Sequence, residues 1–258
     1  MKFTKMLDLI TNVLSQDADT QIDVCMTSQM ANQIELWTRM YENRSPWVNN
    51  KDVHSANLAP AIASELARLV TLEMKSEVTG GNDSGYLDEQ YKRKVLKSIR
   101  RYVEYGCAKG GLVMKPYITQ QGIEVQFVQA DCFFPLSFDS SGRITQCVFT
   151  EQFRKGKKIY TRLEIHSMQA GRIRITNRAF VATNNDSLGS EVSVNSIDRW
   201  SELAPEVTLE GADRLLFGYF KVPLANADDS DSPLGVSVYS RAIGLIKEAD
   251  KRYSNICW

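Results

Sequence analysis

The sequence predicts an α+β protein in which a helical N-terminal part packs on an antiparallel β meander or small barrel and a long helix comes last. Three observations predict this class. Apolar residues recur every three or four positions up to about residue 108, every second position over 112–222, and again at helical spacing after residue 237. Only short turns separate the strand-like stretches, and a parallel crossover needs a dozen or more residues. The β region is therefore expected to be antiparallel.

The N-terminal part is expected to begin with a short helix and to continue with a longer one. The opening segment, 1–17, has an apolar pattern that Asp8 interrupts, and no small-residue cleavage site follows, so it predicts a helix and not a signal peptide. Thr27 or Ser28 can cap the next helix. It should end before Pro46, because the residue before a proline is biased away from helical geometry. Its apolar face is expected to hold Met30, Ile34, Trp37 and Tyr41.

Two more helices are expected before the β region. Ser55 or Asn57 can cap the first, and the glycine-rich segment 79–85 predicts a flexible loop after it. The second should run unbroken from about Leu87 to Gly106. Helical spacing places Leu58, Ile62, Leu66, Leu69 and Met74 on one apolar face and Leu87, Tyr91, Val95, Ile99 and Tyr102 on the other. Both faces are expected to point into the core.

The region 112–222 is expected to form the strands. Six stretches are rich in β-branched and aromatic residues, with turns expected at 120–122, 140–142, 155–157 and 170–171. A polar loop over 183–190, a strand-like stretch over 215–223 and a polar segment over 225–233 follow. The chain is thus expected to comprise a helical part (1–110), a β-rich part (111–222) and a linker with the start of a long helix (223–258).

The final helix is expected to begin at Ser237. Its apolar face should hold Tyr239, Ile243, Ile246, Ala249 and Tyr253. No glycine cap or terminating proline follows this helix. We therefore expect the chain to continue in a longer protein.

Composition and charge exclude several classes of protein. The longest apolar runs are a few residues, whereas a helix that spans a bilayer needs about 20, so no membrane contact is expected. The net charge is zero but uneven: 1–84 carries seven basic and eleven acidic side chains, a net of −4, and 85–110 carries seven and three, a net of +4. A protein that wraps nucleic acid usually has a basic excess throughout. Any contact with DNA is therefore expected to be local.

Residues that usually carry catalysis or bind metals are sparse. His54 and His166 lie far apart in sequence and are expected at the surface or in the core. The GxSxG, HExxH and Walker A motifs are absent, and the glycine pair in 108–111 precedes a strand where a phosphate loop needs a helix. No CxxC pair occurs, and free, mostly buried thiols are expected for Cys25, Cys107, Cys132, Cys147 and Cys257. We expect no catalytic residue, no metal and no cofactor.

Two acidic features leave alternatives open. The loop with Asn226, Asp228, Asp229 and Asp231 offers oxygen ligands for a hard cation but lacks EF-hand spacing, so a solvated loop is favoured. Carboxylates such as Glu151 and Glu164 could serve an enzyme whose site differs from the known motifs. That interpretation is the least favoured.

The strongest local feature is a basic segment without an intervening acid, formed by Lys92, Arg93, Lys94, Lys97, Arg100 and Arg101. Such a face could follow a phosphate backbone. Acids lie nearby in sequence, however, and no surface aromatics are interleaved for base stacking. A solvated or intersubunit face is favoured over direct contact with DNA. The alternative function that follows from this segment is a stand-alone nucleic-acid-binding module.

Several segments, in order, resemble the portal proteins of long-tailed phages that infect Gram-positive bacteria. IELWTRMYENRSPW (34–47) is similar to an early helix and aromatic loop of that family, and LAPAIASELARLVTLEMKSEV (58–78) to its long helix. YGCAKGGLVMKPY (105–117) resembles its helix-to-strand junction. The stretch 123–166, with the aromatic-proline motif at Phe133 to Pro135, resembles its β region, and 217–250 resembles the segment that leads into the stem.

This resemblance implies the wing region of a dodecameric ring at one capsid vertex. It implies a non-enzymatic conduit for DNA packaging and ejection that nucleates head assembly, located in the virion and, during assembly, in the bacterial cytoplasm. The implied partners are other portal subunits, capsid and scaffold proteins, the large terminase subunit, head-completion proteins and double-stranded DNA. Clip, crown and the rest of the stem do not occur before Trp258, so no residue that contacts DNA or terminase is carried over. The −4 and +4 segments are candidates for complementary faces of neighbouring subunits.

Overall fold

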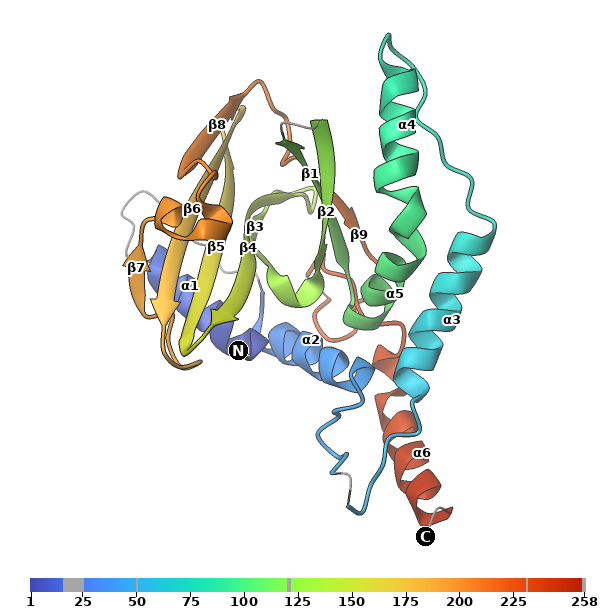
Figure 1. Ribbon diagram of the computed structural model, residues 1–258. Coiled ribbons are helices and arrows are strands. Elements are labelled where there is room, and N and C mark those ends of the chain that lie inside the picture. Colours follow the sequence, from blue (N-terminus) through green and yellow to red (C-terminus); the bar gives the residue numbers. More distant parts are fainter. Residues whose placement is uncertain (16–25, 50, 120–121, 231, 257–258) are drawn as a thin grey trace. The chain divides into compact units, whose positions relative to one another are not determined.

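The computed structural model describes residues 1–15, 26–49, 51–119, 122–230 and 232–256 (Figure 1). It confirms the α+β class, because helices combine with antiparallel sheets and a helix comes last. Two compact units are formed by segments that alternate along the chain. The first contains Met1–Asn32, Asp131–Leu216 and Asp231–Pro233, and the second contains Gln33–Ala130, Phe217–Ser230 and Leu234–Trp258.

These units differ from the three consecutive segments suggested by the sequence. The change of period near residue 111 does mark a change of secondary structure, because α5 (Ile99–Lys109) is followed by β1 (Leu112–Thr119). However, β1 and β2 (Gly122–Gln129) belong to the same unit as the helices before them, whereas the later long strands belong to the other unit. Periodicity reports which element a segment forms but not which core that element joins.

The first unit is built on a six-stranded antiparallel sheet with the order β3-β4-β5-β6-β7, in which β8 also pairs with β6. Its strands are β3 (Phe133–Phe138), β4 (Ile144–Lys155), β5 (Lys158–Gln169), β6 (Arg172–Ala182), β7 (Ser190–Val192) and β8 (Glu206–Glu210). The turns expected at 140–142, 155–157 and 170–171 connect β3 to β6 as predicted. The turn expected at 120–122 includes two residues that lie outside the described part.

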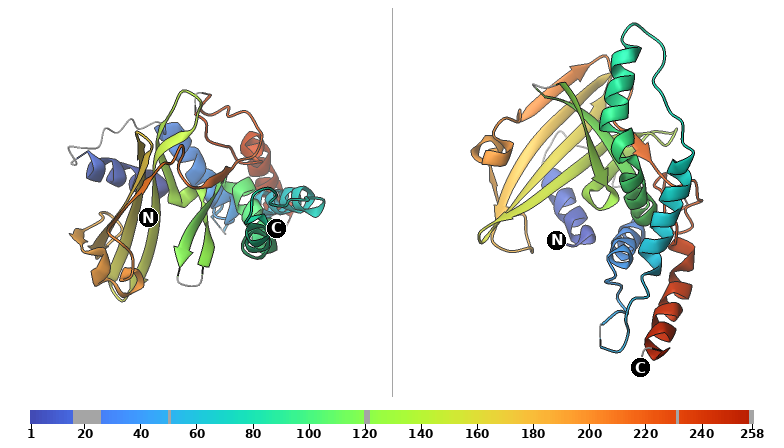
Figure 2. Two further views of the ribbon diagram at one scale, coloured as in Figure 1. Left: turned by 90° about the horizontal axis from the view of Figure 1, so that it is seen from above. Right: turned by 45° about the vertical axis from the view of Figure 1, so that its right-hand side comes forward.

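Both faces of this sheet are covered. Helix α1 (Phe3–Leu14) lies across one face (Figures 1 and 2), where Phe3 stacks on Phe134 with ring centroids 4.5 Å apart. On the other face the indole of Trp200 meets Phe153 edge to face at 5.3 Å, and Trp200 is 2 % exposed. Two short 3-10 turns, Val194–Ser196 and Asp198–Trp200, carry this second cover.

The second unit combines a three-stranded sheet, β2-β1-β9, with helices. Strand β9 (Gly218–Phe220) is only the middle of the strand-like stretch expected over 215–223. The helices are α2 (Ser28–Tyr41), most of which lies in this unit, α3 (Leu58–Leu72), α4 (Ser84–Lys94), α5 and α6 (Ile243–Ile256). No helix among the described residues is long and apolar enough to cross a membrane.

Two glycines explain why a strand can follow α5 so closely. Gly110 ends the helix in the left-handed conformation, with φ 91°, and a Cβ there would lie 2.8 Å from the carbonyl oxygen of Gly235. A Cβ on Gly111 would lie 2.6 Å from the hydroxyl of Tyr219. Only glycine permits both the conformation and the close approach. The pair that weakly suggested a phosphate loop therefore serves helix termination and packing.

The helix expected from Leu87 to Gly106 is not continuous. Helix α4 ends at Lys94, a 3-10 turn spans Leu96–Ser98, and α5 begins at Ile99. Val95 has φ −108° and ψ −64°, which distorts the helical backbone although the side chain keeps its place on the apolar stripe and is buried. Unbroken periodicity hid this change, because a 3-10 turn shifts the side-chain positions only slightly.

The expected apolar face of α3 is also wrong. The buried residues are Ala59, Ala63 and Ala67, and the helix packs against α5 along this side. Of the expected face, Ile62 is 38 % exposed and Leu69 is 53 % exposed. Small side chains allow the two helix backbones to approach, so the alanine side faces inward even though the larger apolar residues define the sequence pattern.

Candidate functional site

The six residues of the basic segment are distributed over three elements of the second unit. Lys92, Arg93 and Lys94 end α4, Lys97 lies in the 3-10 turn, and Arg100 and Arg101 begin α5. No residue of α4 is buried. The break at Val95 therefore separates the segment into two basic groups, instead of the single helical face expected from the sequence.

Part of this basic charge is neutralised inside the unit. The Nζ of Lys92 lies 2.6 Å from a carboxylate oxygen of Asp88, one turn earlier on α4. The Nζ of Lys94 pairs with Glu124 on β2. The hydrogen bond from Lys92 lowers the pKa of Asp88, so this acid stays ionised at neutral pH. Two of the six cations thus have acidic partners within the same unit.

The remaining cations are solvent-exposed. Arg93 donates to the side-chain oxygen of Gln90 at 3.0 Å, and the guanidinium of Arg101 lies 4.8 Å from the centre of the Tyr102 ring. Within the described part of the chain, Lys97 and Arg100 make no ion pair. The pKa of Glu65 is lowered mainly by a hydrogen bond from Arg68, and the positive charge of Arg100 lowers it further. Positive charge thus remains available on the outside of α4 and α5.

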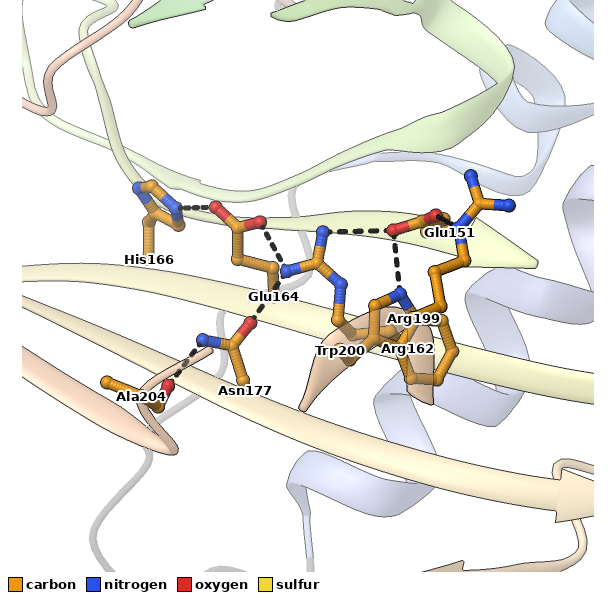
Figure 3. A network of polar contacts seen from close by, with 8 residues as sticks. All are labelled: Glu151, Arg162, Glu164, His166, Asn177, Arg199, Trp200 and Ala204. Atoms are coloured by element: carbon orange, nitrogen blue, oxygen red, sulfur yellow. Dashed lines mark hydrogen bonds and ion pairs between the residues drawn. The ribbon is translucent and has the colours of Figure 1, made fainter. Parts of the chain in front are cut away.

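A buried polar network lies on one face of the sheet in the first unit (Figure 3). Glu151 on β4 is directly opposite Arg162 on β5, and Asn177 on β6 is opposite Glu164. Arg162 donates through Nη2 to Glu151 at 3.2 Å. Through Nη1 it donates to Glu164 at 3.0 Å and to Asn177 at 2.9 Å. One guanidinium therefore links three strands.

Further partners occupy the remaining carboxylate oxygens. The Nε of Arg199 lies 2.6 Å from Glu151, whose other oxygen accepts the indole N–H of Trp200 at 3.0 Å. Glu164 is 2.7 Å from Nε2 of His166. The side chains of Glu151 and Glu164 are only 24 and 10 % exposed, so little of either carboxylate can face a substrate. This arrangement instead fits a structural clamp, since each buried charge is paired.

The sequence contains one signal for this network, on strand β5. Residues 162, 164 and 166 alternate along β5, so Arg162, Glu164 and His166 share one face of the sheet. Three polar residues that alternate with the apolar Leu163 and Ile165 predict a polar cluster on one face of the strand. Two nitrogen atoms in it, Nε of Arg162 and Nδ1 of His166, have no hydrogen-bond partner within the described part of the protein.

A second buried polar contact joins α6 to the loop after α2 in the second unit. Asp250 is 1 % exposed, and its two oxygens accept the indole N–H of Trp47 and the backbone N–H of Ala56, both at 2.8 Å. One turn later, Ser254 accepts the backbone N–H of His54 at 2.7 Å. Helical spacing predicts that Tyr253 lies on the buried side of this helix, but its side chain is 46 % exposed. The spacing of apolar residues does not reveal a helix face that is buried through polar residues such as Asp250 and Ser254.

The histidines lie where the sequence placed them, at the surface or in the core. His166 is buried in the network, and His54 is half-buried beside α6. Cys107 and Cys147 are buried, Cys132 is half-buried, and all three are free thiols, whereas Cys25 and Cys257 lie outside the described residues. Burial raises the pKa of Cys107 to about 11, helped by the charge of Glu104.

The acidic loop is organised by its own backbone. The side-chain oxygen of Asn226 accepts the N–H groups of Asp228 and Asp229 at 3.0 and 2.9 Å. Asp228 accepts a hydrogen bond from Gln33 at 2.9 Å, and burial raises the pKa of its carboxyl. Asp231 lies outside the described residues. In the part of the chain that the structure describes, no group of three or more His, Cys, Asp or Glu side chains could hold a metal ion.

Comparison with known families gives one match that spans nearly the whole chain. The sequence model of the family described as phage portal protein, SPP1 Gp6-like, matches residues 18–258. No curated protein matches the chain. The matched range includes the second unit, the first unit apart from residues 1–17, and the segments on which the resemblance rests.

Proposed function

Because the chain belongs to the phage portal protein family, SPP1 Gp6-like, we propose that it forms part of the wall of the conduit through which DNA is packaged and ejected. Members of this family are structural proteins, not enzymes, and they form an oligomeric ring at the capsid vertex of the virion. The finer proposal is a dodecamer that nucleates head assembly in the host cytoplasm. It would bind scaffold proteins, the large terminase subunit and head-completion proteins.

The observation that carries this proposal is the match over residues 18–258, which extends across both units. The structure supports it through the character of its buried charges. The ionised groups in the first unit pair with one another across β4, β5 and β6. In the second unit, the buried carboxylate of Asp250 holds α6 against the loop after α2 by accepting hydrogen bonds from Trp47 and Ala56. We propose that the helical part and the β-rich part form the wing and that α6 begins the stem.

Localisation in the particle tests the proposal. The chain should be tagged in the phage that encodes it, and the label should be located on purified virions by electron microscopy. We expect the label at a single vertex, and depletion of the protein should leave heads without DNA. A label spread over the whole shell, or normal DNA-filled heads after depletion, would contradict the proposal.

The basic segment is proposed to lie at a subunit interface. Lys97, Arg100 and Arg101 keep exposed positive charge, while Lys92 and Lys94 already have acidic partners. Reversing the charge of Arg100 and Arg101 together should weaken ring assembly, measured by native mass spectrometry. An unchanged oligomer at physiological salt would rule out this role.

The alternative, a stand-alone nucleic-acid-binding module, makes a different prediction for the same segment. Such a module would bind DNA without assembling, and its affinity would fall steeply as salt is raised. The alternative is not favoured, because internal acids neutralise part of the segment. A gel-shift titration against salt distinguishes the two functions.

A further inference from the structure

The outward side of α3 has the spacing of a helix that pairs with another helix. Its residues Leu58, Ile62, Glu65, Leu69 and Leu72 follow one another at steps of four, three, four and three. This 3.5-residue repeat places them along one seam, as in two-stranded coiled coils. The four apolar members are between 36 and 67 % exposed. The alanines on the opposite side already pack against α5.

Exposing this seam is unfavourable for an isolated subunit. Burial of exposed leucine and isoleucine side chains is favourable, so four of them in one row mark a surface that is normally covered. A single charged residue in an otherwise apolar seam commonly sets the register and the partner. Glu65 holds that position in α3. The partner helix should therefore offer an apolar seam with one basic residue.

Helix α6 carries such a seam. Leu245, Ala249, Arg252 and Ile256 follow at steps of four, three and four, on a side of the helix away from Asp250 and Ser254. Leu245 is 76 % exposed, and Ile256 is 83 % exposed. The charged residue is the third member in both seams, and it is acidic in α3 and basic in α6. The two helices also have nearly equal lengths, 15 and 14 residues.

We propose that the α3 seam of one copy packs against the α6 seam of a second copy, with Glu65 facing Arg252. This inference rests on the proposed ring, in which each copy uses two different faces to meet its two neighbours. The charge complementarity of the two seams identifies a second copy as the occupant.

The existing contact of Glu65 leaves room for this partner. Arg68 donates to both carboxylate oxygens at 2.7 and 2.8 Å, but each oxygen has a second lone pair, and the ion pair is exposed. Within the described chain no ion pair involves Arg252. The guanidinium is therefore available for an acid on another copy.

A charge swap tests the inference. The full chain and the variants Glu65→Arg, Arg252→Glu and the double variant should be compared by sedimentation velocity over a wide concentration range. Each single variant should self-associate at least about tenfold more weakly, because it places like charges opposite each other. The double variant should recover most of the association. Lys247→Glu makes the same charge change on a different side of α6 and should associate like the unmodified chain.

The possible failures are distinguishable. If the unmodified chain associates and the single variants associate equally well, or if the double variant is as weak as the singles, the seam contact is wrong and the ring proposal survives. If the unmodified chain stays monomeric at every concentration, both the contact and the proposed ring formation by this chain are wrong. Circular dichroism of each variant should match that of the unmodified chain, since all three positions are exposed.

Discussion

The contact between Asp250 and Trp47 should be a measurable contributor to stability, because it is a buried hydrogen bond to a charged group. The carboxylate is 1 % exposed and accepts two N–H groups at 2.8 Å. Asp250→Ala leaves both donors without their partner at a cost of about 1–3 kcal/mol each, which gives a total loss of about 2–6 kcal/mol. Trp47→Phe removes one donor and keeps an aromatic ring. The coupling between the two substitutions should be about 1.5–3 kcal/mol.

Chemical denaturation of the unmodified chain, both single variants and the double variant supplies this double-mutant cycle. Glu248→Ala is the control on the same helix: its carboxylate pairs with Lys251 at 2.9 Å but is exposed, so the free energy of unfolding should change by no more than about 0.5 kcal/mol. A coupling below about 0.5 kcal/mol would refute the reasoning. It would mean that the hydrogen bond is absent in solution or is replaced by water without loss.

Three further predictions concern the backbone and a buried thiol. Gly110→Ala should lower stability by at least about 2 kcal/mol, because the position is left-handed and the new Cβ would meet the carbonyl oxygen of Gly235. The control Gly156→Ala is also left-handed but has no atom within 4 Å of the new Cβ, so it should cost about 1 kcal/mol. Equal losses of the two variants in thermal melts would contradict the packing argument. Ala170→Asn should raise stability by about 0.5–1 kcal/mol, since residues 170 and 171 both have positive φ, as in the type I′ turn that favours Asn-Gly, and a lower melting temperature would show otherwise. Cys107 should resist iodoacetamide in the folded protein at pH 8, because its pKa is raised to about 11, and rapid labelling of the native protein would disprove the burial. The same shift in pKa should reduce the free energy of unfolding as the pH rises from about 9 through 11, since the thiol of the unfolded chain ionises first.

Local signals predicted the elements well where one physical cause dominates. Met30, Ile34 and Trp37 are buried along α2 as their spacing indicated, and Thr27 caps this helix by accepting the N–H of Met30 at 3.1 Å. The hairpins of the first unit also follow from alternation and turn chemistry, because both act between residues that are close in sequence. The family resemblance likewise depends on the order of short segments, and the match over 18–258 confirms it.

The errors occurred where two properties of a residue compete. On α3 the spacing of leucine and isoleucine predicted that these residues are buried. Close approach to α5 instead buries the side of the helix that carries the alanines. The break at Val95 left the apolar spacing intact and so escaped detection. The network around Arg162 needed strand pairing before its members on β4, β5 and β6 could be recognised as neighbours. The roles of the basic segment remain predictions.

The sequence by itself determined the secondary-structure class, the order of the main elements and the family, because each depends on the order and type of nearby residues. Only the tertiary structure decided which strands share a core, which side of α3 is left uncovered and that Asp250 meets Trp47 across about 200 positions of the chain. The physical reason is that burial depends on which surfaces meet. A periodic sequence shows that a face is apolar, but it does not show whether the same chain or another one covers it.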